Sequence, residues 1–169
     1  MPIRIGKNCY ISKSSVLIGD IEIGDFSMVM ENAVIRGDLN RVIFGNYSNI
    51  QDNATIHVDF NHEANIGDNV SIGHNAVVHG STIEDNVIIG MGAIIMNGAV
   101  IKSGSVVAAG TVVTENFKGE ENALIIGVPG KIKRTGNDLL EYAKLNASSY
   151  QNLRVNYLDG KYDIKYGGR

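Results

Sequence analysis

The sequence predicts a parallel β-helix, a solenoid of short strands, from its repeat, its composition and its turn residues. An aliphatic residue recurs every six positions, as in the run IGDNVSIGHNAV that begins at Ile66. A period of six fits neither a helix nor a half-buried strand, whereas three such blocks make one triangular coil. Glycine is frequent, with 20 residues, while tryptophan is absent and aromatics are only 7%. Glycine, Asn and Asp between the aliphatic residues suit turns that need positive φ.

The repeat extends from about residue 5 to residue 114: it slips and resumes at Phe44, slips again and resumes at Ile66, and a last run starts at Ile83. Residues 123–128 predict one more strand, and residues 137–158 predict a helix whose apolar stripe packs along the solenoid. Asn137 is the expected N-cap of this helix, and a frayed tail should follow it. We therefore expect a β-helix domain over 1–130, with a C-terminal helix and tail over 131–169.

Charge and cysteine content exclude several classes of protein. The net charge is −3 and no long basic run is present, so neither nucleic acid nor an anionic membrane is an expected partner. No apolar run approaches the roughly 20 residues of a membrane span, and the N-terminus lacks a signal-peptide core. Cys9 is the only cysteine, which excludes an internal disulfide and fits a reducing compartment. We expect a cytoplasmic protein.

All four histidines lie between positions 57 and 79. His57 and His79 each follow the aliphatic residue of their block, and the second slip accounts for the extra spacing between them. They should therefore occupy equivalent positions on adjacent coils, on strands about 4.8 Å apart. Two imidazoles at that distance can share a tetrahedral metal ion.

The other two histidines occupy different positions. His74 is the third residue of its block, near a turn on another face, so it can meet His57 and His79 only if it comes from another copy of the chain. A three-sided prism packs naturally into a cyclic trimer. Three protein ligands leave one metal position open, which is typical of a catalytic site. His62 lies in the loop VDFNHEAN and has no register partner; it is either a solvated loop residue or a proton relay.

The segments around these histidines resemble those of the γ-class carbonic anhydrases, which are hexapeptide-repeat proteins. The resemblance covers essentially the whole chain. It rests on Arg36-Gly37-Asp38, Asn49-Ile50-Gln51-Asp52-Asn53, His57, Gly73-His74 and His79-Gly80. It implies a left-handed β-helix and a homotrimer whose interfacial metal is bound by His57, His74 and His79. The implied activity is reversible hydration of CO₂ to bicarbonate by a hydroxide on Zn²⁺, and Fe²⁺ or Co²⁺ would also suit three imidazoles.

The resemblance also implies roles for polar residues near the metal. Arg36, Asp38 and Asp52 would form charged contacts at the subunit boundary, as groups that support metal ligands often do. A purely structural ion pair is the alternative for Arg36 and Asp38. Gln51 would orient the metal-bound solvent. Apart from the resemblance, Asn97 in the stretch GMGAIIMNGAV is expected to reach the site from the next coil or so.

The chain departs from the best-known member of that family at two places. Leu39 follows Arg-Gly-Asp where that enzyme has a glutamate, and the loop after His57 is short instead of long and acidic. Asp59, His62 and Glu63 are the candidates to replace its shuttle glutamate. The proton relay is therefore open, and weak activity is one expectation.

Three other functions fit parts of the sequence. The stretch IIGVPGKIKR resembles the end of the solenoid in hexapeptide-repeat acyltransferases, which need one histidine as a base and no metal. A metal-dependent thioesterase or hydrolase would use the same hydroxide on a carbonyl group. A non-catalytic trimeric metal-binding protein would keep the metal only to hold its subunits together.

Overall fold

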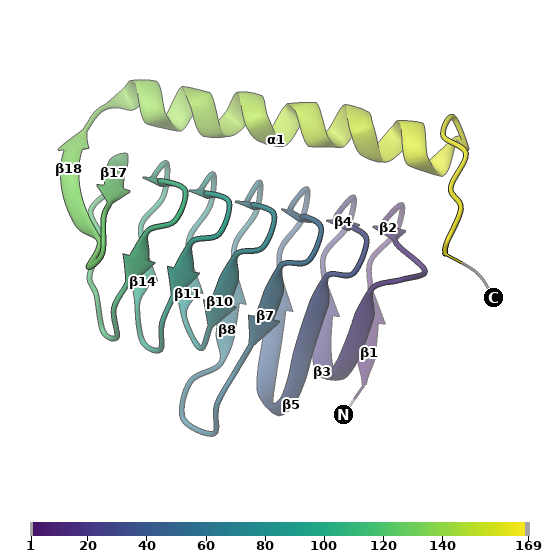
Figure 1. The fold of residues 1–169 in the computed structure, drawn as a ribbon, viewed down its shortest axis with the longest axis horizontal. Helices are drawn as coiled ribbons and strands as arrows, with labels where there is room; N and C mark the ends of the chain where they lie inside the picture. The colour runs from purple at the N-terminus through teal and green to yellow at the C-terminus, as the bar shows by residue number, and fades with distance from the viewer. Residues whose placement is uncertain (1, 168–169) are drawn as a thin grey trace.

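The computed structural model describes residues 2–167 and is a left-handed parallel β-helix followed by one α-helix, which confirms the predicted fold (Figure 1). Its strands form a sheet of ten and a sheet of eight. The ten-stranded sheet contains β1 (Ile3–Ile5), β3 (Val16–Ile23), β5 (Val34–Phe44), β7 (Thr55–His57), β8 (Ala64–Ile66), β10 (Val77–His79), β11 (Thr82–Ile83), β13 (Ile94–Ile95), β14 (Val100–Ile101) and β16 (Val112–Val113). The eight-stranded sheet contains β2 (Tyr10–Ile11), β4 (Met28–Val29), β6 (Asn49–Ile50), β9 (Ser71–Ile72), β12 (Ile88–Ile89), β15 (Val106–Val107), β17 (Ala123–Ile126) and β18 (Lys131–Thr135).

The ten-stranded sheet covers two of the three faces of the prism because β5 turns a corner. The first part of β5 pairs with β7, and its last part pairs with β8. We call the outer surface of β7, β10, β13 and β16, with the first parts of β3 and β5, the histidine face. The eight-stranded sheet forms another face, along which the helix lies (Figure 1).

The six-residue repeat produces a ladder of inward-pointing aliphatic side chains. Ile35, Ile56, Val78 and Ile95 are partners in register on successive coils, and each is fully buried. Full burial of such a side chain contributes about 1.5–3 kcal/mol. One stacked ladder per face thus provides a core without large aromatic rings.

The corners explain why Asn and Gly recur within the repeat. Asn53 and Asn75 have φ of 60° and 59°, and Gly92 and Gly110 take the same place on later coils with φ of 67° and 68°. Asn and Gly adopt this left-handed conformation most readily. The second slip of the repeat is a loop over residues 58–63, between β7 and β8, which projects from the solenoid (Figure 1).

The helix α1 (Asn137–Leu158) spans the predicted residues and buries Leu139, Ala143, Ala147 and Arg154. The predicted N-cap is wrong: Gly136 occupies that position and no side chain caps the helix. The first turn is supported instead by Asp138, which accepts hydrogen bonds of 2.9 and 2.6 Å from the Arg134 guanidinium.

The segment before the helix also differs from the prediction. The last parallel strand ends at Ile126, and β18 then returns antiparallel to β17, because the chain reverses at Gly127, whose φ is 107°. The tail has no helix or strand up to residue 167, and residues 168–169 of the predicted frayed tail lie outside the described range. The division between domains at residue 130 stays a prediction.

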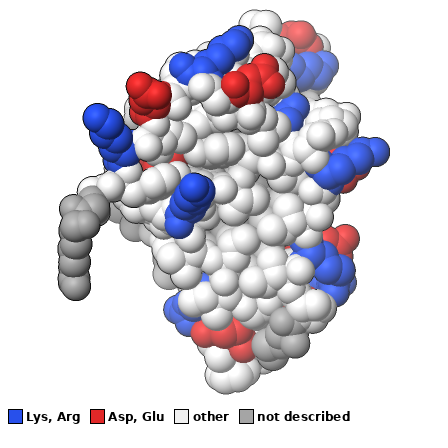
Figure 2. Space-filling model, turned by 90° about the vertical axis from the view of Figure 1, so that its right-hand side faces the viewer, with Lys and Arg blue, Asp and Glu red and all other residues white. Residues whose placement is uncertain are grey.

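The surface of the solenoid carries mixed charge. Figure 2 shows Lys and Arg interspersed with Asp and Glu around the rim of the face that it presents. Within residues 2–167, no helix combines the length and the apolar character needed to cross a membrane.

Candidate metal site

His57 and His79 are partners in register on β7 and β10, as the spacing predicted. Nδ1 of His57 lies 3.0 Å from Nε2 of His79, and the ring centroids are 4.9 Å apart with planes at 75°. Two nitrogens bound at 2.0–2.1 Å to one tetrahedral ion lie about 3.3 Å apart. The pair is therefore spaced as two ligands of a single ion would be.

The other nitrogen of each ring faces an oxygen. His57 Nε2 lies 3.1 Å from Asp38 Oδ1, and His79 Nδ1 lies 2.5 Å from Asn97 Oδ1. Both oxygens accept hydrogen bonds, so in neutral rings these two nitrogens carry the protons. The two nitrogens that face each other then both carry lone pairs. These lone pairs repel each other unless a cation lies between them. Metal-binding histidines generally have such an acceptor on their second nitrogen.

Arg36 completes this group from β5, where it is the register partner of His57. Its Nη1 donates to Asp38 Oδ2 over 2.7 Å, and its Nη2 lies 3.4 Å from His57 Nδ1. The hydrogen bond from Arg36 lowers the pKa of the Asp38 carboxyl, and burial lowers the pKa of His57. The carboxylate and the neutral imidazole are the forms that a metal site requires.

His74 lies at the opposite edge of the histidine face, at the corner between β9 and β10. It precedes His79 by five residues, a stretch that would span at most about 16 Å if fully extended. Its Nδ1 lies 2.9 Å from Asp52 Oδ2. Gln51, next to Asp52, is buried and donates to Asn49 Oδ1 over 3.2 Å. Within the described part of one chain, no three His, Cys, Asp or Glu side chains gather as a metal-binding cluster.

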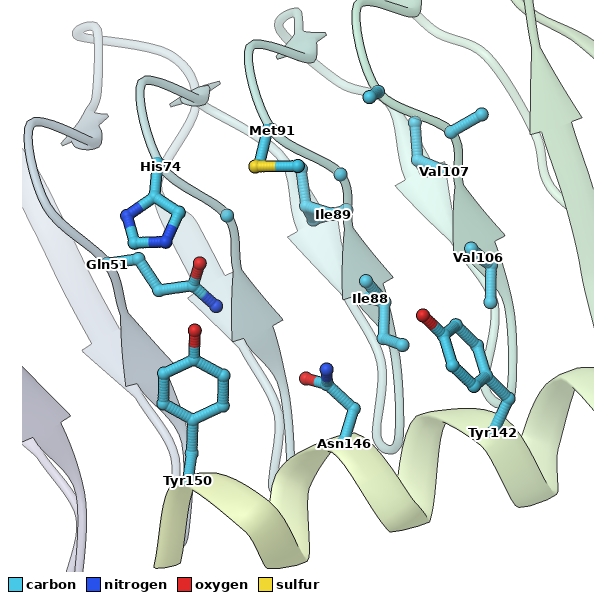
Figure 3. Close-up of a pocket in the computed structure, with 14 residues that line it drawn as sticks. Gln51, His74, Ile88, Ile89, Met91, Val106, Val107, Tyr142, Asn146 and Tyr150 are labelled. Carbon is cyan, nitrogen blue, oxygen red and sulfur yellow. The ribbon is translucent and has the colours of Figure 1, made fainter. Parts of the chain in front are cut away.

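The corner that carries His74 opens into a cavity of about 350 Å³ between α1 and the eight-stranded sheet. Figure 3 shows Gln51 between His74 and Tyr150 in this view, with Asn146 and Tyr142 further along the helix. Burial and, to a smaller extent, the Asp52 charge raise the pKa of Tyr150. The predicted apolar stripe does not identify Tyr142, Asn146 or Tyr150 as cavity residues, because a helical stripe does not show which strand residues it faces.

The loop after His57 places its polar residues unequally. His62 is half-buried and its Nδ1 lies 3.0 Å from Asp59 Oδ1, so the ring is anchored and not freely solvated. Glu63 is exposed and its Oε1 accepts a hydrogen bond from Asn65, on the next face of the prism. Asn97 Oδ1 lies 2.5 Å from His79 Nδ1, and Asn97 Nδ2 donates to Asp59 Oδ2 over 2.6 Å.

The fold and the repeat define a hexapeptide-repeat protein. Residues 2–37, 63–93 and 80–115 match the family described as bacterial transferase hexapeptide (six repeats). The chain is 51% identical over 150 residues to the probable carbonic anhydrase of Methanocaldococcus jannaschii, covering 88% of this chain and 94% of that protein. It therefore belongs to the γ-class carbonic anhydrase family.

Of two further comparisons, the first is with another carbonic anhydrase and the second agrees with the fold. The chain is 36% identical over 156 residues to gamma carbonic anhydrase 1, mitochondrial, of Arabidopsis thaliana, covering 88% of this chain but only 57% of the plant protein. The crystal structure of a hexapeptide transferase family protein from Anaplasma phagocytophilum has a TM-score of 0.87 and 32% identity, covering 91% of this chain and 92% of that one.

Proposed function

We propose that this protein is a γ-type carbonic anhydrase-like metalloenzyme that hydrates CO₂ reversibly to bicarbonate. The carrying observation is the pair of ring nitrogens, on His57 and His79, that face each other at 3.0 Å while their second nitrogens face oxygen acceptors. The relationship to proteins named as carbonic anhydrases supports the same activity.

The third ligand in this proposal is the partner subunit's His74, supplied by a homotrimer. His74 and the pair of His57 and His79 lie at opposite edges of one face, so a cyclic arrangement brings the two edges together around each interface. The first part of the histidine face also exposes aliphatic side chains, with Val16 at 44% and Ile18 at 42%. A partner subunit would cover them.

The residues of the chain support a metal centre of this kind. A bound Zn²⁺, or Fe²⁺ or Co²⁺, would supply a water with a pKa lowered to about 7 as the nucleophile for CO₂. Asp38 holds the His57 ring, Asp52 holds the His74 ring at 2.9 Å, and Arg36 neutralises Asp38. Gln51 places an amide beside His74, where it can orient the reacting water.

Proton transfer to solvent is the step for which the chain offers fewest groups. In the proposal His62 exchanges protons with the buffer, because its ring is only half-buried and lies on the 58–63 loop, which starts directly after His57. Glu63 is the weaker candidate, since its carboxylate is bound to Asn65.

The test is stopped-flow CO₂ hydration with protein of known metal content, loaded with Zn²⁺ and, without oxygen, with Fe²⁺. Hydration should depend on the metal and should be lost with the metal in His57→Ala, whereas His62→Ala should keep its metal. A fully loaded protein that hydrates no CO₂ would overturn the proposal. Ester and thioester hydrolysis, and acyl transfer without metal, would then be measured on the same samples.

A further inference from the structure

We propose that Asp59 is a positioning residue that fixes, through Asn97, which nitrogen of His79 carries the proton. The inference rests on the proposed metal site at His57 and His79 and identifies a residue that supports it. Asp59 lies on the 58–63 loop and Asn97 on the coil beyond His79, so the contact joins segments 38 residues apart.

Both oxygens of Asp59 face the His62 ring, whose Nδ1 lies 3.0 Å from Oδ1 and 3.2 Å from Oδ2, but their other partners differ. Oδ1 accepts the backbone N–H groups of Asn61 and His62, each at 2.8 Å, and thereby closes the turn of the loop. Oδ2 lies 2.6 Å from Asn97 Nδ2. A carboxylate only accepts hydrogen bonds, so the amino group of Asn97 must point toward Asp59.

The orientation of the Asn97 amide then determines the state of His79. With its amino group on Asp59, Asn97 presents Oδ1 to His79 Nδ1 at 2.5 Å. An amide oxygen only accepts, so Nδ1 of the neutral ring carries the proton and Nε2 keeps the lone pair directed at His57. Each hydrogen bond in this series is donated away from the metal position, from His79 to Asn97 and from Asn97 to Asp59.

The same series of hydrogen bonds is a poor path for protons. Transfer from His79 to His62 along it would require the Asn97 amide to give up one proton and accept another. The hydrogen bonds therefore orient the His79 ring, and any proton exchange by His62 has to use water instead.

The fold leaves space for this contact at a glycine. A Cβ atom at Gly80, whose φ is 49°, would lie 2.6 Å from Asn97 Oδ1 and 2.8 Å from His62 Cβ. The absence of a side chain at Gly80 lets the loop lie against the next coils and lets Asn97 reach His79. The loop thus supports the proposed metal site through the contact between Asp59 and Asn97.

The decisive variant is Asp59→Asn, which can keep the turn and reverse the hydrogen-bond direction. Its side-chain oxygen still accepts the N–H groups of residues 61 and 62, while its amino group now donates to Asn97. Asn97 must then turn its own amino group toward His79 and select the tautomer protonated on Nε2. Loss of the support of a ligand typically weakens metal binding about 10–100-fold.

The double variant Asp59→Asn/Asn97→Asp should restore the original direction. The amide at position 59 donates to the carboxylate at position 97, which again accepts the proton of His79 Nδ1. Asn61→Ala changes an exposed amide of the same loop and is the matched control.

The experiment measures ring nitrogen tautomers by long-range ¹H–¹⁵N NMR on the metal-free full chain, and Co²⁺ affinity by titration. We expect the Nδ1–H tautomer of His79 in the wild type and in Asn61→Ala, the Nε2–H tautomer with about 10–100-fold weaker Co²⁺ binding in Asp59→Asn, and recovery of both in the double variant. An Nε2–H tautomer in the wild type, or a double variant no better than Asp59→Asn, would overturn the inference. CO₂ hydration is measured separately: a chain that shows these tautomers and affinities without hydration disproves only the proposed function.

Discussion

Each of the three proposed ligands has one ring nitrogen next to a side-chain oxygen. His57 faces Asp38 at 3.1 Å, His74 faces Asp52 at 2.9 Å and His79 faces Asn97 at 2.5 Å. A neutral imidazole has one donor and one acceptor nitrogen, so each oxygen selects the tautomer that leaves the other nitrogen free. The geometry thus prepares the histidines for metal before any subunit contact forms.

Stability of the metal-free protein should fall as the pH drops below about 6.5. Burial lowers the pKa of His57, so below the ordinary value near 6.5 the unfolded chain binds a proton that the folded chain does not. The contribution is present above about pH 6.5 and is lost as the pH falls toward the folded pKa. Asp38 and Asp59 also have lowered pKa values, but as carboxyls they lose their contribution only near pH 4 and below.

The measurement is urea unfolding of metal-free wild type and His57→Gln at steps between pH 5 and 8. The free energy of unfolding of the variant should depend less on pH than that of the wild type below about pH 6.5, where the His57 contribution is lost. Identical pH dependence in the two proteins would show that His57 is not the group responsible.

The pairing of His57 with His79 could be predicted from the sequence because it depends only on counting residues per coil. The same counting placed His74 on another edge. It could not find the contact between Asp59 and Asn97, since the conformation of an irregular loop is not fixed by the repeat. Nor could it show that Glu63 turns toward Asn65, because the direction of a loop side chain follows from local hydrogen bonds.

At the scale of elements, the helix α1 makes a wall of the cavity beside His74. Leu139, Ala143 and Ala147 are buried at 6%, 1% and 3% exposure, while Tyr142, Asn146 and Tyr150 line the cavity. The small buried alanines let the helix lie close to the strands. The apolar stripe in the sequence predicted the span of this helix. The N-cap and β18 depend on the chain reversal before the helix, about which the stripe carries no information.

Leu139→Ala should destabilise the protein by about 2 kcal/mol, the lower end for a buried leucine, because the residue lies in the first turn of the helix. Leu145→Ala, on the same helix but 68% exposed, is the control and should stay within about 0.5 kcal/mol of the wild type. Chemical unfolding monitored by circular dichroism measures both. Equal losses in the two variants would show that the helix is not held by its buried stripe.

At the scale of the whole molecule, the proposed site exists only between subunits. One edge of the histidine face carries His57 and His79, and the other edge carries His74. Substitution of a histidine on either edge should therefore abolish every metal site in a trimer of identical chains. Two different substitutions, carried by different chains of one trimer, should complement each other only when they lie on opposite edges.

Mixed trimers of His57→Ala and His74→Ala chains should regain metal, whereas each variant alone should bind none. A trimer with both kinds of chain contains an interface at which all three histidines are intact. Co-expression with two affinity tags, followed by metal analysis of the doubly purified protein, measures this. The control is a mixture of His57→Ala and His79→Ala, whose lesions share an edge. Recovery in the control, or none in the test mixture, would contradict an interfacial site.

The position of the 58–63 loop at a corner has a consequence for how such proteins diversify. Every coil returns to the register of the coil below it, so the extra residues leave His79 opposite His57. An insertion at this corner therefore changes the surroundings of the metal site without shifting the ladder that holds the ligands. Selection can rebuild the loop, in length and in chemistry, as a module separate from the inherited ligand frame.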